Sequence, residues 1–487
     1  MLRRLFSKPT LVACALPTFL SFAAFTVRAQ QPAAVGIAVP VSPEIAQLVP
    51  QAQGWLSDLI RINTTNPPGN EMEAAKYVAA VLQKEGIANE IIEIAPGRGV
   101  VVARLQAGAL PDPSKALLLL GHLDVVGVDK SKWSVDPFAA TVKDGYLYGR
   151  GAIDDKAMVA ANLATIVALK RAGVRLNRDV IFAADDDEEQ GGAASIKTLI
   201  DKHWDKIACG YALNEEGRVV VQNGKVQYVG IQASEKVSFN VAVVATGASG
   251  HASVPRPDNA VVHLAAAVEK LGNYETPVQM MTITRRYFEQ LAQVEDEETA
   301  KWIRALEMPE RLDLAARRLR DMSPVWNSML RDTIAPTMLE AGVRANVVPS
   351  EARANLNIRL LPGNSINDLI TQMRKVVNDP QISFELQPDS GSAAPPSSLT
   401  TDLYQMIEHT VPQAFPGAIA VPMISTGATD AAQIRLHNVQ AYGLLPFPMT
   451  EADILRMHAD DERIPVTSFS TGVAFLYTIV HGFVTAN

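Results

Sequence analysis

Residues 116–124 of the chain read ALLLLGHLD and are its most informative stretch. The apolar run shows no alternation with polar residues, which is typical of a strand buried on both faces, as in a parallel sheet. A histidine and an acid follow the run directly, as His122 and Asp124. Because ligands gather at the carboxyl ends of strands in open α/β sheets, these two residues are candidates for a functional site.

The segments around this run predict a layered α/β domain. Residues 71–85 and 156–172 have helical spacing and are each followed by a glycine. Residues 179–184 (DVIFAA) form a second buried strand. Alternating strand and helix patterns predict a mostly parallel sheet flanked by helices.

A second unit begins near Ser234 and has a different order of elements. Its patterns predict a strand at 237–245, a helix at 258–271 and a charged helical stretch at 283–332. Two strands at 336–344 and 351–360, a helix at 365–377 and a strand at 381–387 follow. Apart from the charged stretch, this is the βαββαβ order of ferredoxin-like modules. We therefore predict an α+β domain over 234–390, inserted into a catalytic domain formed by 44–233 and 391–487.

The N-terminal residues have the composition of a secretory signal. Residues 1–29 combine a basic start, an apolar stretch and small residues before Ala29, and 30–43 form a proline-rich linker. The alternative is an uncleaved membrane anchor, which the short apolar stretch and Pro17 disfavour. We expect a periplasmic or secreted product without a membrane span, because no second apolar stretch approaches the length of one.

Composition excludes several classes of protein. The chain has 487 residues, of which 48% are hydrophobic and 20% charged, as in globular proteins of two or three domains. Two cysteines, Cys14 and Cys209, exclude a scaffold built on disulfides. A net charge of −8 gives no basic footprint for nucleic acid.

Acids and a histidine follow several predicted strands. His122, Glu188, Glu189 and Glu215 would all lie at strand ends in the predicted sheet. Buried together, such groups need a positive partner, and neutral imidazole with carboxylates suits zinc. Asp124 lies two residues after His122, so it could accept the second ring N–H of a metal-bound histidine.

Each feature also has an ordinary structural explanation. His122 could be a buried histidine with satisfied hydrogen bonds, and the acid run 185–189 could be a solvated turn. Asp154 and Asp155 precede a helix and could serve as its N-cap. Taken singly, these alternatives are at least as good as a metal site.

Six motifs that occur in a fixed order are far more specific than any one of these residues. They are GHLD (121–124), GRGAIDDK (149–156), DEEQGG (187–192), GHAS (250–253), NVVP (346–349) and RMH (456–458). From about Glu44 to its end the chain resembles the di-zinc metallopeptidase family of aminoacylase, carnosinase, acetylornithine deacetylase, succinyl-diaminopimelate desuccinylase and glutamate carboxypeptidase. In this resemblance the inserted domain over 234–390 corresponds to a lid and dimerisation domain. Residues 234–236 (SEK) and the extra helical stretch resemble the branch of carboxypeptidase S and N-acyl amino acid hydrolases.

The resemblance implies two zinc ions, with cobalt or manganese as alternatives. Asp154 would bridge the ions, with the remaining ligands being His122, Glu189, Glu215 and His458. Relatives read Asp-Glu-Gly-Gly where this chain has NEEG at 214–217, so Glu216 is the alternative to Glu215. The bond between Asp154 and Asp155 is cis in the relatives.

The resemblance also implies the reaction, in which a metal-activated water cleaves an amide bond next to a free carboxylate. Glu188 would be the general base and Asp124 the acid behind His122. His251 would stabilise the oxyanion from the partner subunit of a homodimer, and the substrate, a small peptide or N-acyl amino acid, would contact Arg359, Asn346 and Gly427. The alternatives are a dipeptidase or amidase without a carboxylate requirement, or a metal-binding homologue without catalysis.

Overall fold

The computed structural model describes residues 35–108, 112–192, 195–388, 391 and 393–485. The predicted signal peptide (1–29) and the first part of the predicted linker, 30–34, lie outside the described residues.

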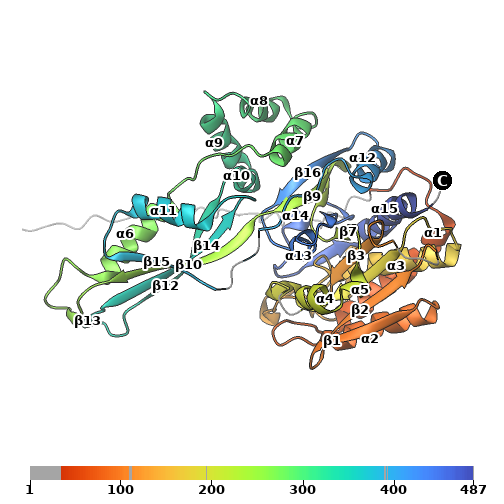
Figure 1. The fold of residues 1–487 in the computed structure, drawn as a ribbon, viewed down its shortest axis with the longest axis horizontal. Coiled ribbons are helices and arrows are strands. Elements are labelled where there is room, and N and C mark those ends of the chain that lie inside the picture. The colour runs from red at the N-terminus through yellow and green to blue at the C-terminus, as the bar shows by residue number, and fades with distance from the viewer. Residues whose placement is uncertain (1–34, 109–111, 193–194, 389–390, 392, 486–487) are drawn as a thin grey trace, which may run out of the picture. The chain divides into compact units, whose positions relative to one another are not determined.

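A mixed sheet of ten strands forms the larger part of the fold (Figure 1). Its order is β1-β2-β6-β3-β7-β17-β9-β8-β18, with β16 paired to β9. The strands are β1 (Asn89–Ala95), β2 (Arg98–Leu105), β3 (Leu117–His122), β6 (Val180–Asp185), β7 (Tyr211–Asn214), β8 (Arg218–Gln222), β9 (Lys225–Glu235), β16 (Ile419–Ser425), β17 (Gln440–Gly443) and β18 (Pro448–Met449). The central strands β6, β3, β7 and β17 are parallel, whereas β1 and β2 are antiparallel additions at one edge.

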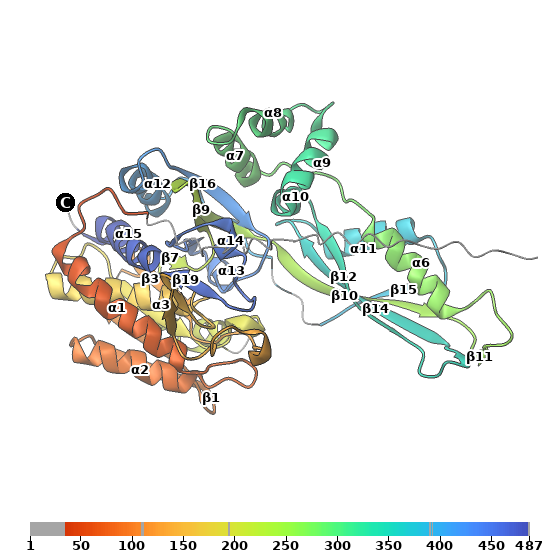
Figure 2. The same ribbon diagram turned by 180° about the vertical axis from the view of Figure 1, so that it is seen from behind.

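Helices cover both faces of this sheet, and the leucine run shows why (Figure 2). Leu117 and Leu119 belong to one core, and Leu118 and Leu120 belong to the other, because successive side chains of a strand point to opposite faces. The first core is covered by α1 (Pro43–Arg61), α2 (Glu71–Lys84), α3 (Lys156–Ala172), α12 (Asp402–Ala414) and α15 (Val466–Val484). The second is covered by α4 (Ile196–Lys202), α5 (Trp204–Ile207) and α13 (Ala431–Arg435).

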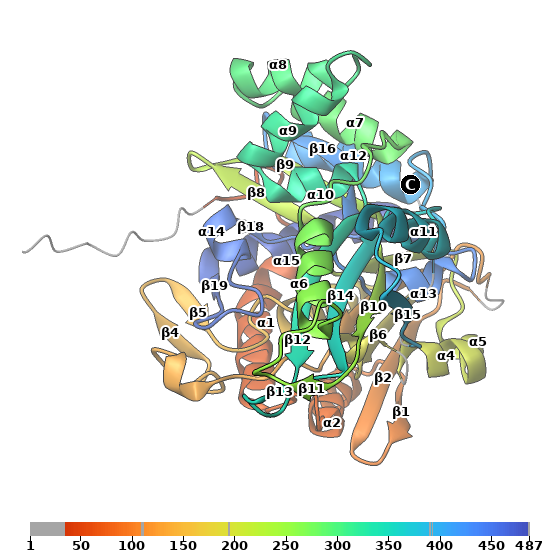
Figure 3. The same cartoon turned by 90° about the vertical axis from the view of Figure 1, so that its left-hand side faces the viewer.

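A separate antiparallel sheet lies in the inserted segment, in the order β12-β14-β10-β15. Its elements are β10 (Val237–Thr246), α6 (Ala260–Gly272), β12 (Thr333–Ala341), β14 (Glu351–Leu360), α11 (Ile366–Val377) and β15 (Ile382–Leu386). The helices α6 and α11 share a core with this sheet (Figure 3). The βαββαβ order is as predicted, and the predicted fold class is confirmed. The domain boundaries at 233/234 and 390/391 stay predictions.

The charged stretch at 283–332 forms four helices between α6 and β12. They are α7 (Thr282–Leu291), α8 (Glu297–Ala305), α9 (Leu312–Met322) and α10 (Pro324–Leu330). Phe288 and Leu291 of α7 share a core with Val421 and Met423 of β16. These helices lie between α6 and β12 in the chain, and they pack against the edge of the ten-stranded sheet.

The remaining elements are short. They are the three-stranded sheet of β4 (Thr141–Lys143), β5 (Tyr146–Tyr148) and β19 (Arg463–Pro465), the pair β11 (Gly250–His251) and β13 (Val347–Val348), the helix α14 (Glu451–Ile454), and the 3-10 turns at Lys130–Lys132 and Glu188–Gln190.

The last helix corrects one expectation about membranes. Among the described residues, α15 alone is long and apolar enough, by length and composition, to cross one. The prediction that no second stretch approaches that length was therefore wrong. However, most of this helix is buried, and Phe469, Phe475 and Leu476 lie in the core. Core helices of soluble proteins have the same property.

Candidate active site

Three neighbouring parallel strands bring the predicted site residues to one edge of the sheet. His122 is the last residue of β3. Glu188 and Glu189 form the turn just after β6, and Glu215 follows β7 directly. Because β6, β3 and β7 are adjacent and parallel, these side chains meet at their carboxyl ends, as expected.

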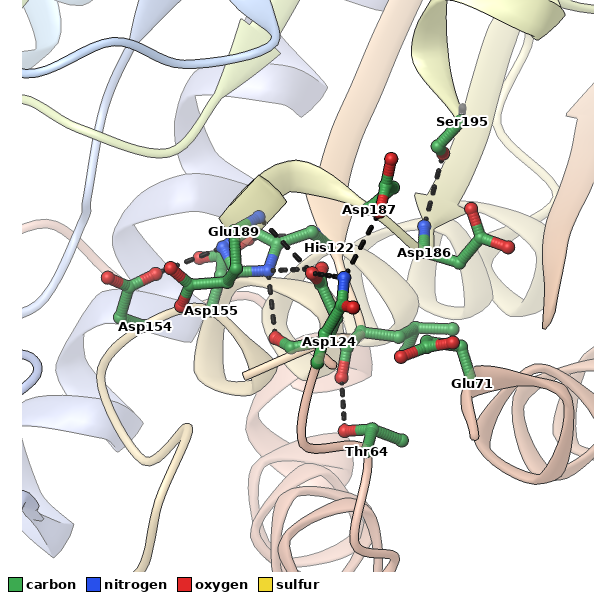
Figure 4. Close-up of polar contacts among 12 residues, drawn as sticks. Thr64, Glu71, His122, Asp124, Asp154, Asp155, Asp186, Asp187, Glu189 and Ser195 are labelled. Carbon is green, nitrogen blue, oxygen red and sulfur yellow. Dashed lines mark hydrogen bonds and ion pairs between the residues drawn. The ribbon is translucent and has the colours of Figure 1, made fainter. Parts of the chain in front are cut away.

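Asp154 lies between two histidines that come from distant parts of the chain. Its Oδ1 is 3.0 Å from Nε2 of His122, and its Oδ2 is 3.1 Å from Nε2 of His458. Nε2 of His458 is also 3.2 Å from Oε1 of Glu189. Figure 4 shows Asp154 on one side of His122 and Asp124 on the other. This arrangement suits a carboxylate that bridges two cations, one beside each histidine.

The structure distinguishes the two adjacent glutamates after β7. Glu215 Oε2 lies 3.8 Å from Nε2 of His122, whereas Glu216 Oε1 accepts a hydrogen bond of 2.7 Å from the Ser425 hydroxyl. Glu216 has a left-handed backbone with φ of 70°. Ligand atoms of His122, Glu188 and Glu215 lie within 4.8 Å of one another, as do those of His122, Asp154 and Glu189.

Asp124 lies behind His122, on the side away from Asp154. Its Oδ1 is 3.2 Å from Nδ1 of His122, and its Oδ2 accepts a hydrogen bond of 2.9 Å from Asn66. The backbone N–H of Glu189 donates to the same Oδ2 at 3.2 Å. Asp124 therefore orients His122 and also contacts the turn that carries Glu188 and Glu189. Nothing in the sequence around Asn66 identified it as part of this network.

The electrostatics of the cluster fit a bound cation. Burial, followed by the nearby Asp154, raises the pKa of Glu215 to about 8. Burial and then Glu215 raise the pKa of Glu188. Hydrogen bonds to Asp154 and Glu189 raise the pKa of His458 to about 10.

Besides burial, these pKa shifts share a second cause, which is an excess of negative charge in a small volume. Among the residues that the structure describes, the ion-pair partners of Asp154, Glu189 and Glu215 are histidines. Protons on the histidines therefore compensate the carboxylates. Divalent cations would supply that charge instead, and a set of imidazoles and carboxylates is suited to zinc.

A glycine and a cis bond shape the loop before α3. The bond between Asp154 and Asp155 is cis, as the resemblance implied. Asp155 is buried, and its Oδ2 accepts a hydrogen bond of 3.2 Å from the backbone N–H of His122. A Cβ at Gly121 would lie only 2.8 Å from that same oxygen, which explains the glycine before His122.

A buried ion pair that sequence reasoning missed links Asp154 to His458. Glu462 is fully buried and accepts a 2.7 Å bond from Arg150. Its two oxygens also accept hydrogen bonds from the backbone N–H groups of residues 151, 153 and 154, at 3.1, 2.7 and 3.2 Å. Arg150 in turn donates to the His458 carbonyl at 3.3 Å. The only signal in the sequence was that Glu462 ends an acidic run just after the RMH motif.

The predicted lid residues lie on two parts of the insertion. His251 is exposed and its Nδ1 is 2.7 Å from the Ser253 hydroxyl. Asn346 is exposed, and its carbonyl accepts a bond of 3.0 Å from the N–H of Ala252, so it lies beside His251. Within the described part of the chain, neither residue forms a hydrogen bond or ion pair with the cluster.

Arg359 and Gly427 are placed elsewhere. Arg359 is half-buried on β14, opposite Ser238 of β10, and its Nε donates to Asn357 at 3.1 Å. The N–H of Gly427 donates to Ser425 at 2.9 Å, and Ser425 is the residue that bonds Glu216. Gly427 is thus connected through two hydrogen bonds to the residue after Glu215, and the substrate contacts of both residues stay predictions.

Comparisons with known proteins agree on one family. The family model described as Peptidase family M20/M25/M40 matches residues 118–482. "Probable carboxypeptidase S-like 2" of Dictyostelium discoideum is 30% identical over 389 residues, which cover 76% of this chain and 72% of that protein. "N-fatty-acyl-amino acid synthase/hydrolase PM20D1" of Homo sapiens is 29% identical over 377 residues, covering 76% and 74%.

A solved structure shares the fold over almost the whole chain. The M20 family metallo-carboxypeptidase from Sulfolobus solfataricus matches with a TM-score of 0.65 and 20% identity, covering 91% of this chain and 99% of that one. Human carnosine dipeptidase 1 matches with a TM-score of 0.61 and 15% identity, covering 90% and 99%.

Proposed function

The chain belongs to peptidase family M20/M25/M40, as its motifs predicted, and is a metal-dependent hydrolase; we propose that it holds two zinc ions and cleaves an amide bond next to a free carboxylate. Its substrates would be small peptides that lose their C-terminal residue, or N-acyl amino acids that lose the acyl group. The observation that carries this proposal is the position of Asp154 between His122 and His458, with Glu188 beside His122.

Two sets of side chains would hold the metal ions. His122, Asp154 and Glu215 would bind one, and Asp154, Glu189 and His458 the other. When bound, zinc lowers the pKa of a water toward 7 and polarises a carbonyl oxygen. Asp124 would keep Nε2 of His122 directed at its ion, because the Nδ1–H of His122 faces the Asp124 backbone carbonyl at 3.0 Å and its carboxylate at 3.2 Å.

Glu188 would move the proton during the reaction. Its carboxylate lies close to His122 and Glu215, and it is not one of the groups that pair with Asp154. Burial raises its pKa, so it can accept a proton from the attacking water and later donate it to the departing amine. Arg359 on the inserted sheet would bind the substrate carboxylate through its guanidinium fork.

The test combines metal analysis with a substrate panel. We expect about two zinc ions per chain, and hydrolysis of N-acyl amino acids or dipeptides that falls strongly when the α-carboxylate is replaced by an amide. Activity that ignores this replacement would favour the dipeptidase or amidase alternative. The Glu188→Gln variant should lose turnover and retain zinc, and an unchanged rate would refute the assignment of Glu188 as the base. If the wild-type protein turns over no substrate on the panel, the metal-binding homologue is favoured.

Location and assembly extend the proposal. The composition of residues 1–29 supports export to the periplasm or the exterior, which N-terminal sequencing of the product from the periplasmic fraction would test. The exposed position of His251 on the insertion supports a homodimer in which it serves the partner's site. A monomer in solution whose activity still depends on His251 would refute this.

A further inference from the structure

A cavity of about 260 Å³ lies between the edge of the ten-stranded sheet and the inserted helices. Its walls come from β8, β9 and β16 on one side, from α7, α9 and α10 on the other, and from α14. The described residues that line it include none of those predicted to bind metal. It is therefore separate from the cluster around Asp154, and its chemistry needs its own explanation.

One part of the cavity wall is aromatic and rigid. Tyr228, Tyr287 and Trp326 line it together with Met329. The rings of Tyr228 and Tyr287 meet edge to face at 6.5 Å, and the Trp326 indole donates to the Tyr287 hydroxyl at 3.1 Å. Because these polar atoms are paired with each other, the side chains are held in place and present apolar surface to an occupant.

Charges of both signs face the same cavity. Arg218, Glu295 and Glu451 line it, and all three act on the hydroxyl of Tyr228. Burial raises the pKa of that hydroxyl, Arg218 lowers it, and the two glutamates raise it, so all three charges act on one side chain of the wall. The Arg218 side chain therefore brings a positive charge to the cavity wall that also carries the two carboxylates.

We propose that this cavity binds a free amino acid with a large apolar side chain. The carboxylate would accept from Arg218, the ammonium group would face Glu295 and Glu451, and the side chain would contact the aromatic wall. The volume is below the roughly 300–1,000 Å³ of pockets for drug-sized ligands, which suits a single amino acid. A simple carboxylate or a simple amine would leave charge of one sign in the cavity unmatched.

The inference does not require the proposed hydrolysis, although that reaction would release such a molecule. Two of the elements that line the cavity lie close in the chain to predicted metal ligands. β8 begins shortly after Glu215, and α14 ends shortly before His458. An amino acid bound here would therefore contact the two segments that carry these predicted ligands without occupying the cluster.

Calorimetry with L-phenylalanine on the full chain tests the proposal. We expect one equivalent to bind both to the zinc-loaded protein and to protein stripped of metal by a chelator. The analogues are compared on the metal-free protein, which cannot hydrolyse N-acyl amino acids by the proposed reaction. Phenylalanine amide lacks the carboxylate and N-acetylphenylalanine lacks the ammonium group, so each should bind at least about tenfold more weakly, because a charge-assisted hydrogen bond is lost.

Substitutions of cavity residues test whether phenylalanine binds in the cavity. Arg218→Gln and Trp326→Leu should each weaken binding about tenfold or more, and Glu295→Gln, a change in a loop, gives a third variant should either of these fail to fold. Trp302→Leu is the matched control, because Trp302 belongs to the same inserted helices but does not line the cavity. It should bind like the wild type.

Three results would overturn the proposal: no binding to the wild type at millimolar phenylalanine, binding that disappears with the metal, or binding that the cavity variants leave unchanged. The second would place the amino acid at the metal cluster. None of these measurements uses turnover, so a failure here is distinguishable from a failure of the proposed hydrolysis.

Discussion

Replacing Glu462 by glutamine is the sharpest perturbation of the framework around the metal cluster. The carboxylate is fully buried and accepts from Arg150 and from three backbone N–H groups, at distances between 2.7 and 3.2 Å. The glutamine amide has one acceptor oxygen, and its NH₂ group would face donors. Arg150 would then stay buried without its charged partner.

The magnitude follows from these contacts. Removing one partner of a buried ion pair costs about 3–5 kcal/mol, and each buried donor left unpaired costs about 1–3 kcal/mol. Because these costs overlap, we expect Glu462→Gln to lose about 3–5 kcal/mol of unfolding free energy at pH 8. The Glu462 carboxylate also accepts from the N–H of Asp154, and its partner Arg150 donates to the His458 carbonyl. Zinc affinity should therefore fall about 10- to 100-fold, as when other groups that orient metal ligands are removed.

Urea unfolding of the metal-free protein and chelator competition for zinc measure the two effects separately. Glu385→Gln is the matched control, since Glu385 forms an exposed pair with Arg353 at 3.1 Å and its loss should cost less than about 1 kcal/mol. A Glu462→Gln protein that unfolds within about 1 kcal/mol of the wild type and binds zinc as tightly would refute the reasoning.

Three further predictions concern stability. Stripping the metal ions should lower the melting temperature, because a ligand at about 1,000 times its Kd adds about 4 kcal/mol to unfolding, and a wild-type temperature after chelation would contradict the predicted site. Lys236→Met should cost about 2–4 kcal/mol in urea unfolding, since the buried Nζ donates to Ser328, Arg331 and Thr333, whereas the exposed Lys143→Met should be neutral. A hydrogen bond to Asp379 raises the pKa of His263, so this contribution is complete below the unfolded pKa of about 6.5 and is lost as pH rises through the higher folded value. The melting temperature of His263→Gln should therefore fall further below that of the wild type at pH 6 than at pH 9, and an equal gap would show that the pair does not titrate as described.

Local patterns in the sequence determined the elements and the kinds of side chain at their ends. The run at 117–120 predicted a strand buried on both faces, and the structure divides its leucines between two cores because side chains alternate along a strand. The position of His122 and Glu189 at neighbouring strand ends followed from parallel pairing alone. The six ordered motifs predicted the family, which the comparisons confirm.

Only the tertiary structure decided which distant residues meet. The family resemblance implied that His458 and Asp154 share a site, but hydropathy patterns carry no information on that contact, since it depends on how the chain after α14 returns to the loop before α3. The hydrogen bond that Glu216 accepts depends on Ser425, which comes from another strand. Glu462 looked like one more acid in a surface run, and only packing shows it buried against Arg150, because burial is a property of the assembled fold and not of neighbouring letters.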